Sequence, residues 1–403
     1  MTPARRVAVT GVGAICAAGL DVPTLWATLC AGASGIAHDE RAGRPLARVR
    51  GFDAAAQFES RPLAMLDRAA QFALVAAREA MAGAGLARPA DADIDPTRCG
   101  AVLGAGLGHE TLEDGYQAFY GRNAARLHPF LVPRAMPSAP ASQLSLAYGL
   151  QGPTLAVATA CASSAHAIGL AFQFVRAGLL DFALAGGSDA PLVPGMLKAW
   201  EGLRVFSDDT CRPFSRDRSG LVMGEGAALL VLEDWQQATR RGATVLAEIV
   251  GFGMSADAHD ITAPSADGAA RAMAAALHDA GAAAREVGYV NAHGTGTRLN
   301  DRCEAQALAT VFGQRLPELP VSSCKGQIGH TLNAAGALET LATVLALRDG
   351  VLPPSANFRE ADPECALDCV PNVARAQAVE LAMANSFAFG GLNAVLLLRR
   401  SAG

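Results

Sequence analysis

Cys161 is the residue of this chain with the clearest capacity for nucleophilic chemistry. It stands between two apolar runs, residues 152–158 and 165–172, which is typical of a buried strand, a tight turn and a buried helix. A thiol in the first turn of a helix meets the positive end of the helix dipole and unpaired backbone N–H groups. Both favour the thiolate, the form that attacks carbon. The alternative interpretation is a small buried hydrophobic residue.

Two histidines favour the nucleophile interpretation. His293 and His330 each follow a predicted strand, and each has a glycine beside it. Loops at strand ends converge in α/β proteins, so we expect both side chains to share a pocket with Cys161. Imidazoles beside a thiol suit acid–base and nucleophilic catalysis. His166 lies inside the apolar helix and is interpreted as structural.

Composition excludes several other classes of function. Hydrophobic residues make up 51% of the 403 residues and charged residues 18%, which predicts a large core. The net charge of −5 without a basic run argues against nucleic acid. Apolar runs stay shorter than a membrane span, so we expect a cytoplasmic protein. The nine scattered cysteines suggest neither a disulfide framework nor a metal site.

Strands and helices alternate along the chain, which indicates an α/β protein. The glycines near residue 11 lack the third glycine of a dinucleotide fingerprint and are interpreted as turn residues. Residues 121–140 are expected to be loop-like. A new series of strands begins near residue 243, so we expect two similar halves, 1–242 and 243–403. The strands are expected at residues 6–13, 100–108, 182–187, 227–233, 245–250, 287–291, 320–323, 379–384 and 394–399.

Five motifs together resemble the β-ketoacyl-[acyl carrier protein] synthases of the elongating, ketosynthase II type. Two further stretches, residues 200–204 and 251–259, are more similar to nodulation-type and type II polyketide ketosynthases. The motifs are Thr159-Ala160-Cys161, Arg212-Pro213-Phe214 with Met223-Gly224-Glu225-Gly226, Asn291 to Thr297, Lys325 to His330, and Asn385 to Gly391.

The resemblance implies a thiolase fold, with two duplicated halves packed as five layers, α-β-α-β-α, and a dimer. It implies decarboxylative Claisen condensation of a malonyl-[acyl carrier protein] with an acyl group held on Cys161. His293 and His330 would assist decarboxylation and stabilise the enolate. No cofactor is implied, because loss of CO2 drives formation of the carbon–carbon bond. The product serves fatty acid or polyketide biosynthesis.

The resemblance also implies supporting roles around this set. Lys325 would orient His330 and form an ion pair with Glu304. The backbone N–H groups of Cys161 and Phe389 would form an oxyanion hole, and Phe389 would also gate the acyl chain. The hydroxyls that would hold the phosphopantetheine arm are those of Thr295 and Thr297.

Partners and the acyl tunnel follow from the same resemblance. The partner would be an acidic acyl carrier protein that docks on basic residues, with Arg61, Arg68, Arg122 and Arg126 as candidates. Gly108 falls where the family commonly has a bulky aliphatic residue and would open the acyl tunnel. Trp200 would refill part of that volume or offer a flat face to a conjugated or aromatic chain. A turn glycine that needs unusual backbone angles is the alternative interpretation of Gly108.

Some alternatives stay open. Asn333 stands where the family commonly has glycine, and its effect is not predicted. The chain is expected to form a homodimer, or a heterodimer with a chain-length-factor-like subunit. A degradative thiolase, which acts on coenzyme A thioesters, would carry a second cysteine near the C-terminal glycine turn, and residues 387–393 have none. An initiating ketosynthase would pair cysteine and histidine with asparagine.

Overall fold

Ten strands form one mixed sheet in the order β10-β9-β13-β14-β8-β1-β7-β6-β4-β5, in a computed structural model that describes residues 4–401. Half of the strands come from the N-terminal part: β1 (Val7–Cys16), β4 (Cys99–Ala105), β5 (Thr154–Val157), β6 (Phe182–Asp189) and β7 (Gly226–Asp234). The others are β8 (Ala247–Ala256), β9 (Tyr289–Asn291), β10 (Val321–Ser322), β13 (Leu381–Ala388) and β14 (Leu392–Arg400). These bounds match the strands expected from the sequence to within a few residues, except that β8 and β13 extend further toward the C-terminus.

The same strand pattern occurs twice. In the first half β7 is antiparallel to both β1 and β6, and β4 and β5 continue in parallel from β6. In the second half β14 is antiparallel to both β8 and β13, and β9 and β10 continue in parallel from β13. Three antiparallel pairs, from Val7–Ile249 to Val9–Ala247, join the two halves edge to edge. The expected duplication is therefore confirmed.

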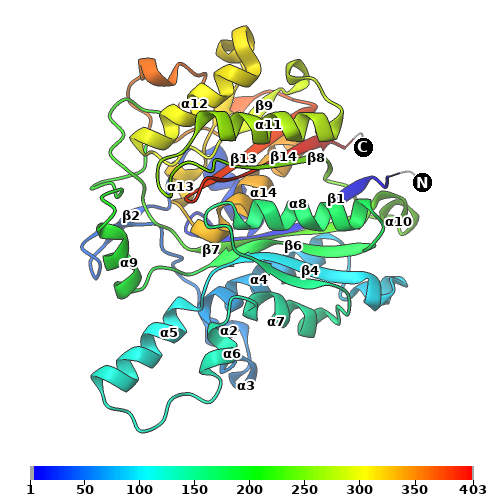
Figure 1. The fold of residues 1–403 in the computed structure, drawn as a ribbon. Coiled ribbons are helices and arrows are strands. Elements are labelled where there is room, and N and C mark those ends of the chain that lie inside the picture. Colours follow the sequence, from blue (N-terminus) through cyan, green and yellow to red (C-terminus); the bar gives the residue numbers. More distant parts are fainter. Residues whose placement is uncertain (1–3, 402–403) are drawn as a thin grey trace.

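Helices fill the space between the two halves of the sheet and cover both outer faces (Figure 1). The central layer is α8 (Ser163–Arg176) with α14 (Ala335–Asp349), which contact each other and strands of both halves. α4 (Arg68–Gly83) and α7 (Ala139–Tyr148) cover the first half. α11 (Ala266–Ala280) and α12 (Arg298–Phe312) cover the second. The predicted five-layer thiolase fold is confirmed.

The central helix α14 is buried on nearly every side, from Ala335 to Leu347. Its hydroxyl groups are satisfied within the helix, because Thr340 and Thr343 donate to the carbonyls of Gly336 and Glu339 at 2.6 and 2.8 Å. A buried polar group without such a partner would be costly. The carboxylate of Glu339 is the polar group of α14 that needs a partner from another element.

The remaining elements are short connections. They are α1 (Val22–Cys30), β2 (Ala37–Asp39), β3 (Arg44–Leu46), α2 (Ala54–Gln57), α3 (Ser60–Leu63), α5 (His109–Tyr116), η3 (Gln117–Gly121), α6 (Leu131–Ala135), α9 (Pro194–Glu201), α10 (Trp235–Arg240), α13 (Lys325–Ile328), η6 (Leu332–Ala334), β11 (Val351–Leu352) and β12 (Arg375–Ala376). The loop expected at 121–140 contains α6 and the start of α7. Among residues 4–401, no helix is long and apolar enough to cross a membrane.

The expected boundary at residues 242 and 243 falls in the connection between α10 and β8. One hydrophobic cluster nevertheless contains residues of both halves, among them Phe172 of α8 and Leu345 of α14. The division of the chain into two halves at this boundary stays a prediction, and the two halves share a hydrophobic core.

Gly108 has neither of the roles predicted for it. Its φ of −70° is ordinary, so the interpretation as a turn glycine with unusual angles is wrong. A Cβ atom there would lie 2.8 Å from both the Cα of Ala135 and the carbonyl oxygen of Arg134. A side chain would therefore meet the backbone of α6 rather than an open tunnel, and Gly108 is absent from the lining of the pocket that contains Cys161.

We expect Gly108→Ala to lower the melting temperature, because the added methyl group displaces the backbone at Ala135. Overpacking of this kind typically costs about 1–3 kcal/mol. Gly121→Ala is the matched control, since a Cβ there has nothing within 4 Å. Thermal unfolding of both variants checks this, and equal melting temperatures would contradict the close packing.

Candidate active site

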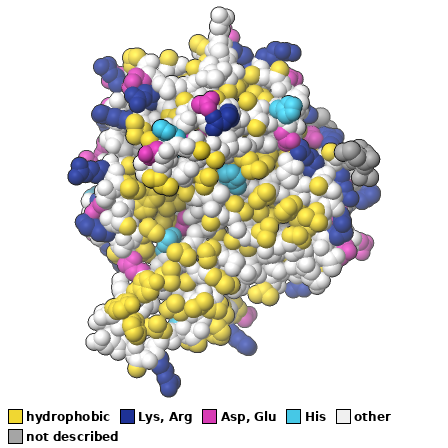
Figure 2. Space-filling view, in the orientation of Figure 1, with side chains coloured by type: hydrophobic (Ala, Val, Ile, Leu, Met, Phe, Trp, Pro, Cys, Tyr) yellow, Lys and Arg dark blue, Asp and Glu magenta, His cyan; other side chains and the backbone are white. Residues whose placement is uncertain are grey.

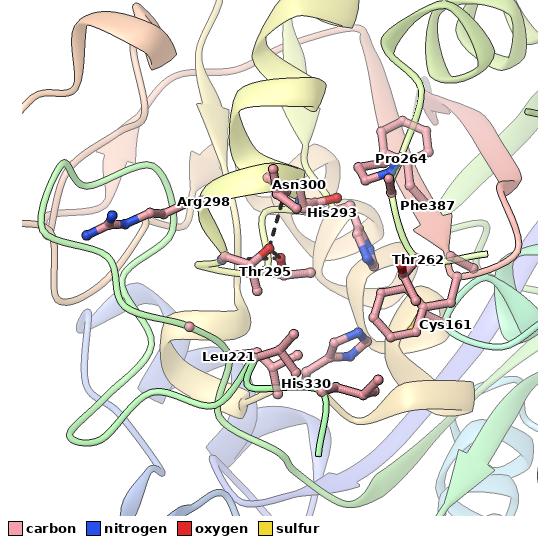
Figure 3. Close-up of a pocket in the computed structure, with 18 of the residues that line it drawn as sticks. Cys161, Leu221, Thr262, Pro264, His293, Thr295, Arg298, Asn300, His330 and Phe387 are labelled. Atoms are coloured by element: carbon pink, nitrogen blue, oxygen red, sulfur yellow. Dashed lines mark hydrogen bonds between the residues drawn. The ribbon is translucent and has the colours of Figure 1, made fainter. Parts of the chain in front are cut away.

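Cys161, His293 and His330 line one cavity of about 400 Å³. Figure 3 shows both imidazole rings pointing into the same space as Cys161. Each residue comes from a different loop: between β5 and α8, between β9 and α12, and between α13 and η6. The structure thus brings together the three residues that the sequence predicted to meet.

Cys161 is buried at a strained turn. It lies two residues before α8, outside the first helical turn where we expected it. The preceding Ala160 has a φ of +48°, a left-handed conformation that costs a non-glycine residue energy. The backbone N–H groups of Cys161 and Phe389 lie beside the sulfur, where both favour its thiolate form. These are the two groups predicted to form an oxyanion hole.

The environment of the thiol differs from the expectation of a thiolate stabilised by the helix. Burial raises the pKa of Cys161 to about 11, while the charge of Lys325 and the two backbone N–H groups act to lower it. Desolvation of the charged form therefore outweighs the favourable dipoles. Cys161 is therefore a neutral thiol at neutral pH.

Hydrogen bonds fix the tautomers of both histidines. The ammonium of Lys325 lies 3.2 Å from His293 Nδ1, and the backbone N–H of Leu332 lies 3.2 Å from His330 Nδ1. Both partners can only donate, so both Nδ1 atoms must accept. Each Nε2 therefore carries the proton. The ring centroids are 5.5 Å apart, which suits two N–H donors that converge on one oxygen.

Both imidazoles are neutral at neutral pH. Burial lowers the pKa of His293 and of His330 well below 6.5, and the positive charge of Lys325 lowers both further.

Gly329, which precedes His330, has a φ of +68°, and a Cβ there would lie 2.5 Å from that of Ala47. Glycine at this position therefore lets the loop deliver His330 into the pocket.

Lys325 does not have the partners that the resemblance implied. Its ammonium forms a buried ion pair with Glu339 of α14, not with Glu304. It also donates to the carbonyl of His293 at 2.6 Å, so it orients His293, whereas the backbone of Leu332 orients His330. Burial raises the pKa of Glu339 to about 7, and Lys325 opposes this shift.

Glu304 instead supports the backbone of the His293 loop. Its carboxylate accepts from the N–H groups of His293 and Gly294 at 2.9 and 2.8 Å, and from the amide of Asn385 at 3.1 Å. Burial raises the pKa of Glu304 to about 7.

The sequence analysis missed Glu339, although an acidic residue within the apolar run 335–347 was a signal for it.

Thr295 and Thr297 lie at the other side of the cavity, as Figure 3 shows for Thr295. Their hydroxyls are 2.8 Å apart. Trp200 and Phe389 also line the cavity, and their rings stack at 5.8 Å and 20°. Trp200, which was predicted to line the acyl tunnel, thus lies against Phe389, the residue predicted to gate it.

The candidate arginines are distributed differently from the prediction. Arg68 binds the buried carboxylate of Glu225 with two hydrogen bonds of 2.8 and 2.9 Å, so it serves the fold rather than docking. Arg122 and Arg126 are exposed in the segment between η3 and α6. The exposed arginines that line the cavity are Arg204 and Arg298, which the sequence analysis did not name.

Comparison with known proteins agrees with this geometry. The family description "Beta-ketoacyl synthase, N-terminal domain" matches residues 4–238, and the corresponding C-terminal domain matches residues 246–359. Nodulation protein E of Rhizobium sp. (strain N33) is 46% identical, over 98% of this chain and 99% of its own. The 3-oxoacyl-[acyl-carrier-protein] synthase 2 of Staphylococcus aureus (strain COL) is 38% identical, over 99% of both chains.

Solved structures of ketosynthases are similar over the whole chain. The ishigamide ketosynthase/chain length factor superposes with a TM-score of 0.94 at 34% identity, covering 99% of this chain and all of that one. A type II polyketide ketosynthase in complex with its acyl-carrier protein gives a TM-score of 0.90 at 30% identity, with the same coverage. The chain therefore belongs to the β-ketoacyl synthase family and is an acyltransferase that performs a decarboxylative Claisen condensation.

Proposed function

We propose that Cys161 receives the acyl group, and that His293 and His330 activate the malonyl extender. The observation that carries this proposal is the pair of neutral Nε2–H donors beside a buried thiol. In the first step the sulfur loses its proton to water and attacks the acyl thioester. The carbonyl oxygen is held by the N–H groups of Cys161 and Phe389, the carbon–sulfur bond to the carrier breaks, and the carrier leaves as a thiolate that takes up a proton from water.

In the second step the malonyl thioester loses its carboxylate as CO2. The electron pair passes to an enolate, whose oxygen accepts from the Nε2–H groups of His293 and His330. The enolate carbon attacks the acyl carbonyl on Cys161 and forms the new carbon–carbon bond. The thiolate of Cys161 then leaves and is protonated by water. Atoms and electrons balance without a cofactor, so we propose that none is used.

We propose that the substrates arrive on the phosphopantetheine arm of an acyl carrier protein. Thr295 and Thr297 would hydrogen-bond the arm along the cavity wall. Arg204 and Arg298 would meet the phosphate and the acidic carrier at the entrance. An acyl-carrier protein is part of one similar solved complex, which supports this partner. We also propose that the protein works in the cytoplasm, where such carriers are found.

We propose that a second subunit covers the protruding segment, residues 107–135, which contains α5, η3 and α6 (Figure 1). Figure 2 shows hydrophobic side chains gathered on this segment at the lower left. Next to it, β5 is an edge strand. Exposed apolar patches of this kind mark interfaces. A homodimer and a heterodimer with a chain-length-factor-like subunit both fit, and light scattering on the pure chain separates them. The exposed residues are Leu107, Tyr116, Phe119, Tyr120, Val132, Leu146 and Leu155.

A coenzyme A-dependent thiolase is a weaker candidate. Such an enzyme would need a second cysteine near Phe389, and residues 387–393 have none.

Phe389 lies between Ala388 and two glycines with positive φ, of 83° and 67°, which would let its ring swing away from Trp200. We propose that this movement admits the acyl chain.

The three proposed catalytic residues are expected to fail in different steps. Cys161→Ser is expected to abolish acyl transfer, because a hydroxyl is a far weaker nucleophile than a thiolate. His293→Ala and His330→Ala are expected to lower decarboxylation of malonyl thioester by roughly 10²–10³, the usual cost of one oxyanion donor. They should affect acylation of Cys161 less. CO2 release and the mass of the acyl-enzyme are measured separately, and equal loss in both assays would identify a histidine as the activating base.

Alkylation of Cys161 by iodoacetamide is expected to become faster with each pH unit up to about pH 10. The raised pKa of about 11 leaves little thiolate at neutral pH, and each unit increases that fraction about ten-fold. Mass spectrometry of the modified peptide gives the rate, with Cys161→Ser as the blank. A rate that reaches its plateau near pH 7 would show that the N–H groups and Lys325 outweigh burial.

Charge reversal at the entrance is expected to weaken carrier docking. Arg204→Glu with Arg298→Glu should raise the apparent KM for an acyl-carrier substrate roughly ten-fold and reduce its salt dependence. The N-acetylcysteamine thioester of the same acyl group lacks the phosphate and the carrier, so its KM should change little. Arg122→Glu with Arg126→Glu is the matched control. A larger effect from that pair would place docking on the protruding segment.

A further inference from the structure

Asp189 is a buried carboxylate that the reaction described above does not use. It ends β6 and is 1% exposed. Its Oδ2 accepts from the backbone N–H and the side-chain amide of Asn333 at 3.2 and 2.5 Å. Its Oδ1 has no hydrogen-bond partner within residues 4–401, and His109 Nε2 lies 3.6 Å away from it. Burial raises the pKa of Asp189, while His109 and the bonds from Asn333 oppose that shift.

Asn333 connects this carboxylate to the turn that contains Cys161. Its Oδ1 lies 2.8 Å from the hydroxyl of Ser163. That hydroxyl also accepts from the backbone N–H of Thr159 at 2.8 Å and lies 2.6 Å from the carbonyl oxygen of Ala160. The single proton of this hydroxyl is therefore shared between two acceptors, Asn333 Oδ1 and the carbonyl oxygen of Ala160, and so joins Asn333 to the backbone on the N-terminal side of the nucleophile turn. The turn includes the left-handed Ala160, whose strain must be held in place by its surroundings.

The orientation of the Asn333 amide follows from its partners. A carboxylate accepts only, so the NH2 group of the amide must face Asp189 and its oxygen must face Ser163. Asn333 thus needs both ends of its side chain, which neither glycine nor alanine provides. Two glycines leave room for Asn333: a Cβ at Gly106 would lie 2.7 Å from its side-chain amide nitrogen, and a Cβ at Gly187 would lie 2.8 Å from its backbone carbonyl oxygen.

We propose that Asn333 is a positioning residue that clamps the Cys161 turn to the His330 loop. Asn333 follows His330 by three residues, and Ser163 follows Cys161 by two. The contact between Asn333 and Ser163 therefore fixes the separation between the sulfur and the second imidazole, and Asp189 anchors the clamp to β6. The inference rests on the proposed role of Cys161 as nucleophile.

The clamp acts on the rate of reaction rather than on substrate binding. Asn333, Ser163 and Asp189 are absent from the lining of the cavity, so their removal leaves the binding surface unchanged. A less rigid turn moves the sulfur and its oxyanion donors away from the reactive geometry, and small displacements of this kind lower rates strongly. A purely structural role would lower stability and leave the rate per folded molecule unchanged.

The test is a double-mutant cycle on acylation of Cys161. Asn333→Ala, Ser163→Ala and the double variant react with an acyl-[acyl carrier protein] under single-turnover conditions, and the mass shift gives the rate. Each single variant is expected to be roughly ten-fold slower with an unchanged half-saturating substrate concentration, about the effect of one hydrogen bond. The double variant is expected to be no slower than the slower single variant, because both changes break one connection.

Thr10→Val is the matched control, since it removes a buried hydrogen bond to Glu233 far from the site and should keep the parent rate. Asn333→Ala at the parent rate, or two losses that multiply in the double variant, would overturn the inference. If Asn333→Ala does not fold, Ser163→Ala still tests the inference, because it removes only one oxygen atom. Acylation of Ser163→Ala at the parent rate would equally overturn the inference. A parent protein that is never acylated on Cys161 would instead refute the proposed function.

Discussion

The site depends on how the buried ammonium of Lys325 is neutralised. Its three protons have three acceptors: the carboxylate of Glu339, the carbonyl oxygen of His293 and the Nδ1 atom of His293. A buried charge without a partner would be very costly, so this arrangement is strongly specified once the chain folds. It ties the central helix α14 to the His293 loop and sets the tautomer of one proton donor.

The polarity of the cavity suits the chemistry of decarboxylation. Its two histidines are held neutral, and the one ammonium beside them is already paired. The carboxylate of a malonyl group therefore enters a region with no free cation among the described lining residues next to Cys161. Losing hydration there is costly for the charged carboxylate and far less costly for the neutral product CO2. The donors that remain, two Nε2–H groups, match the oxygen on which charge develops.

The sequence predicted which of the proposed catalytic residues would meet in one cavity better than it predicted the residues that support them. Cys161, His293 and His330 were predictable because each has a distinctive residue type at the end of a strand. The partner of Lys325 was not, since both Glu304 and Glu339 are within one or two dozen residues, and the choice needs the position of α14. Gly108 was misinterpreted because a glycine that permits close packing of two backbones looks the same in a sequence as one that opens a tunnel. Arg68 likewise reveals its buried partner Glu225 only in three dimensions.

The repeated strand pattern places Cys161 and His330 in equivalent loops. The first leads from β5 into α8, the corresponding edge strand of the other half is β10, and its loop leads through α13 and His330 into α14. The proposed nucleophile and one of the two proposed proton donors thus occupy two copies of a single strand–turn–helix unit. Neither unit alone contains both residues, so Cys161 and His330 can meet only after the two halves of the chain have packed against each other.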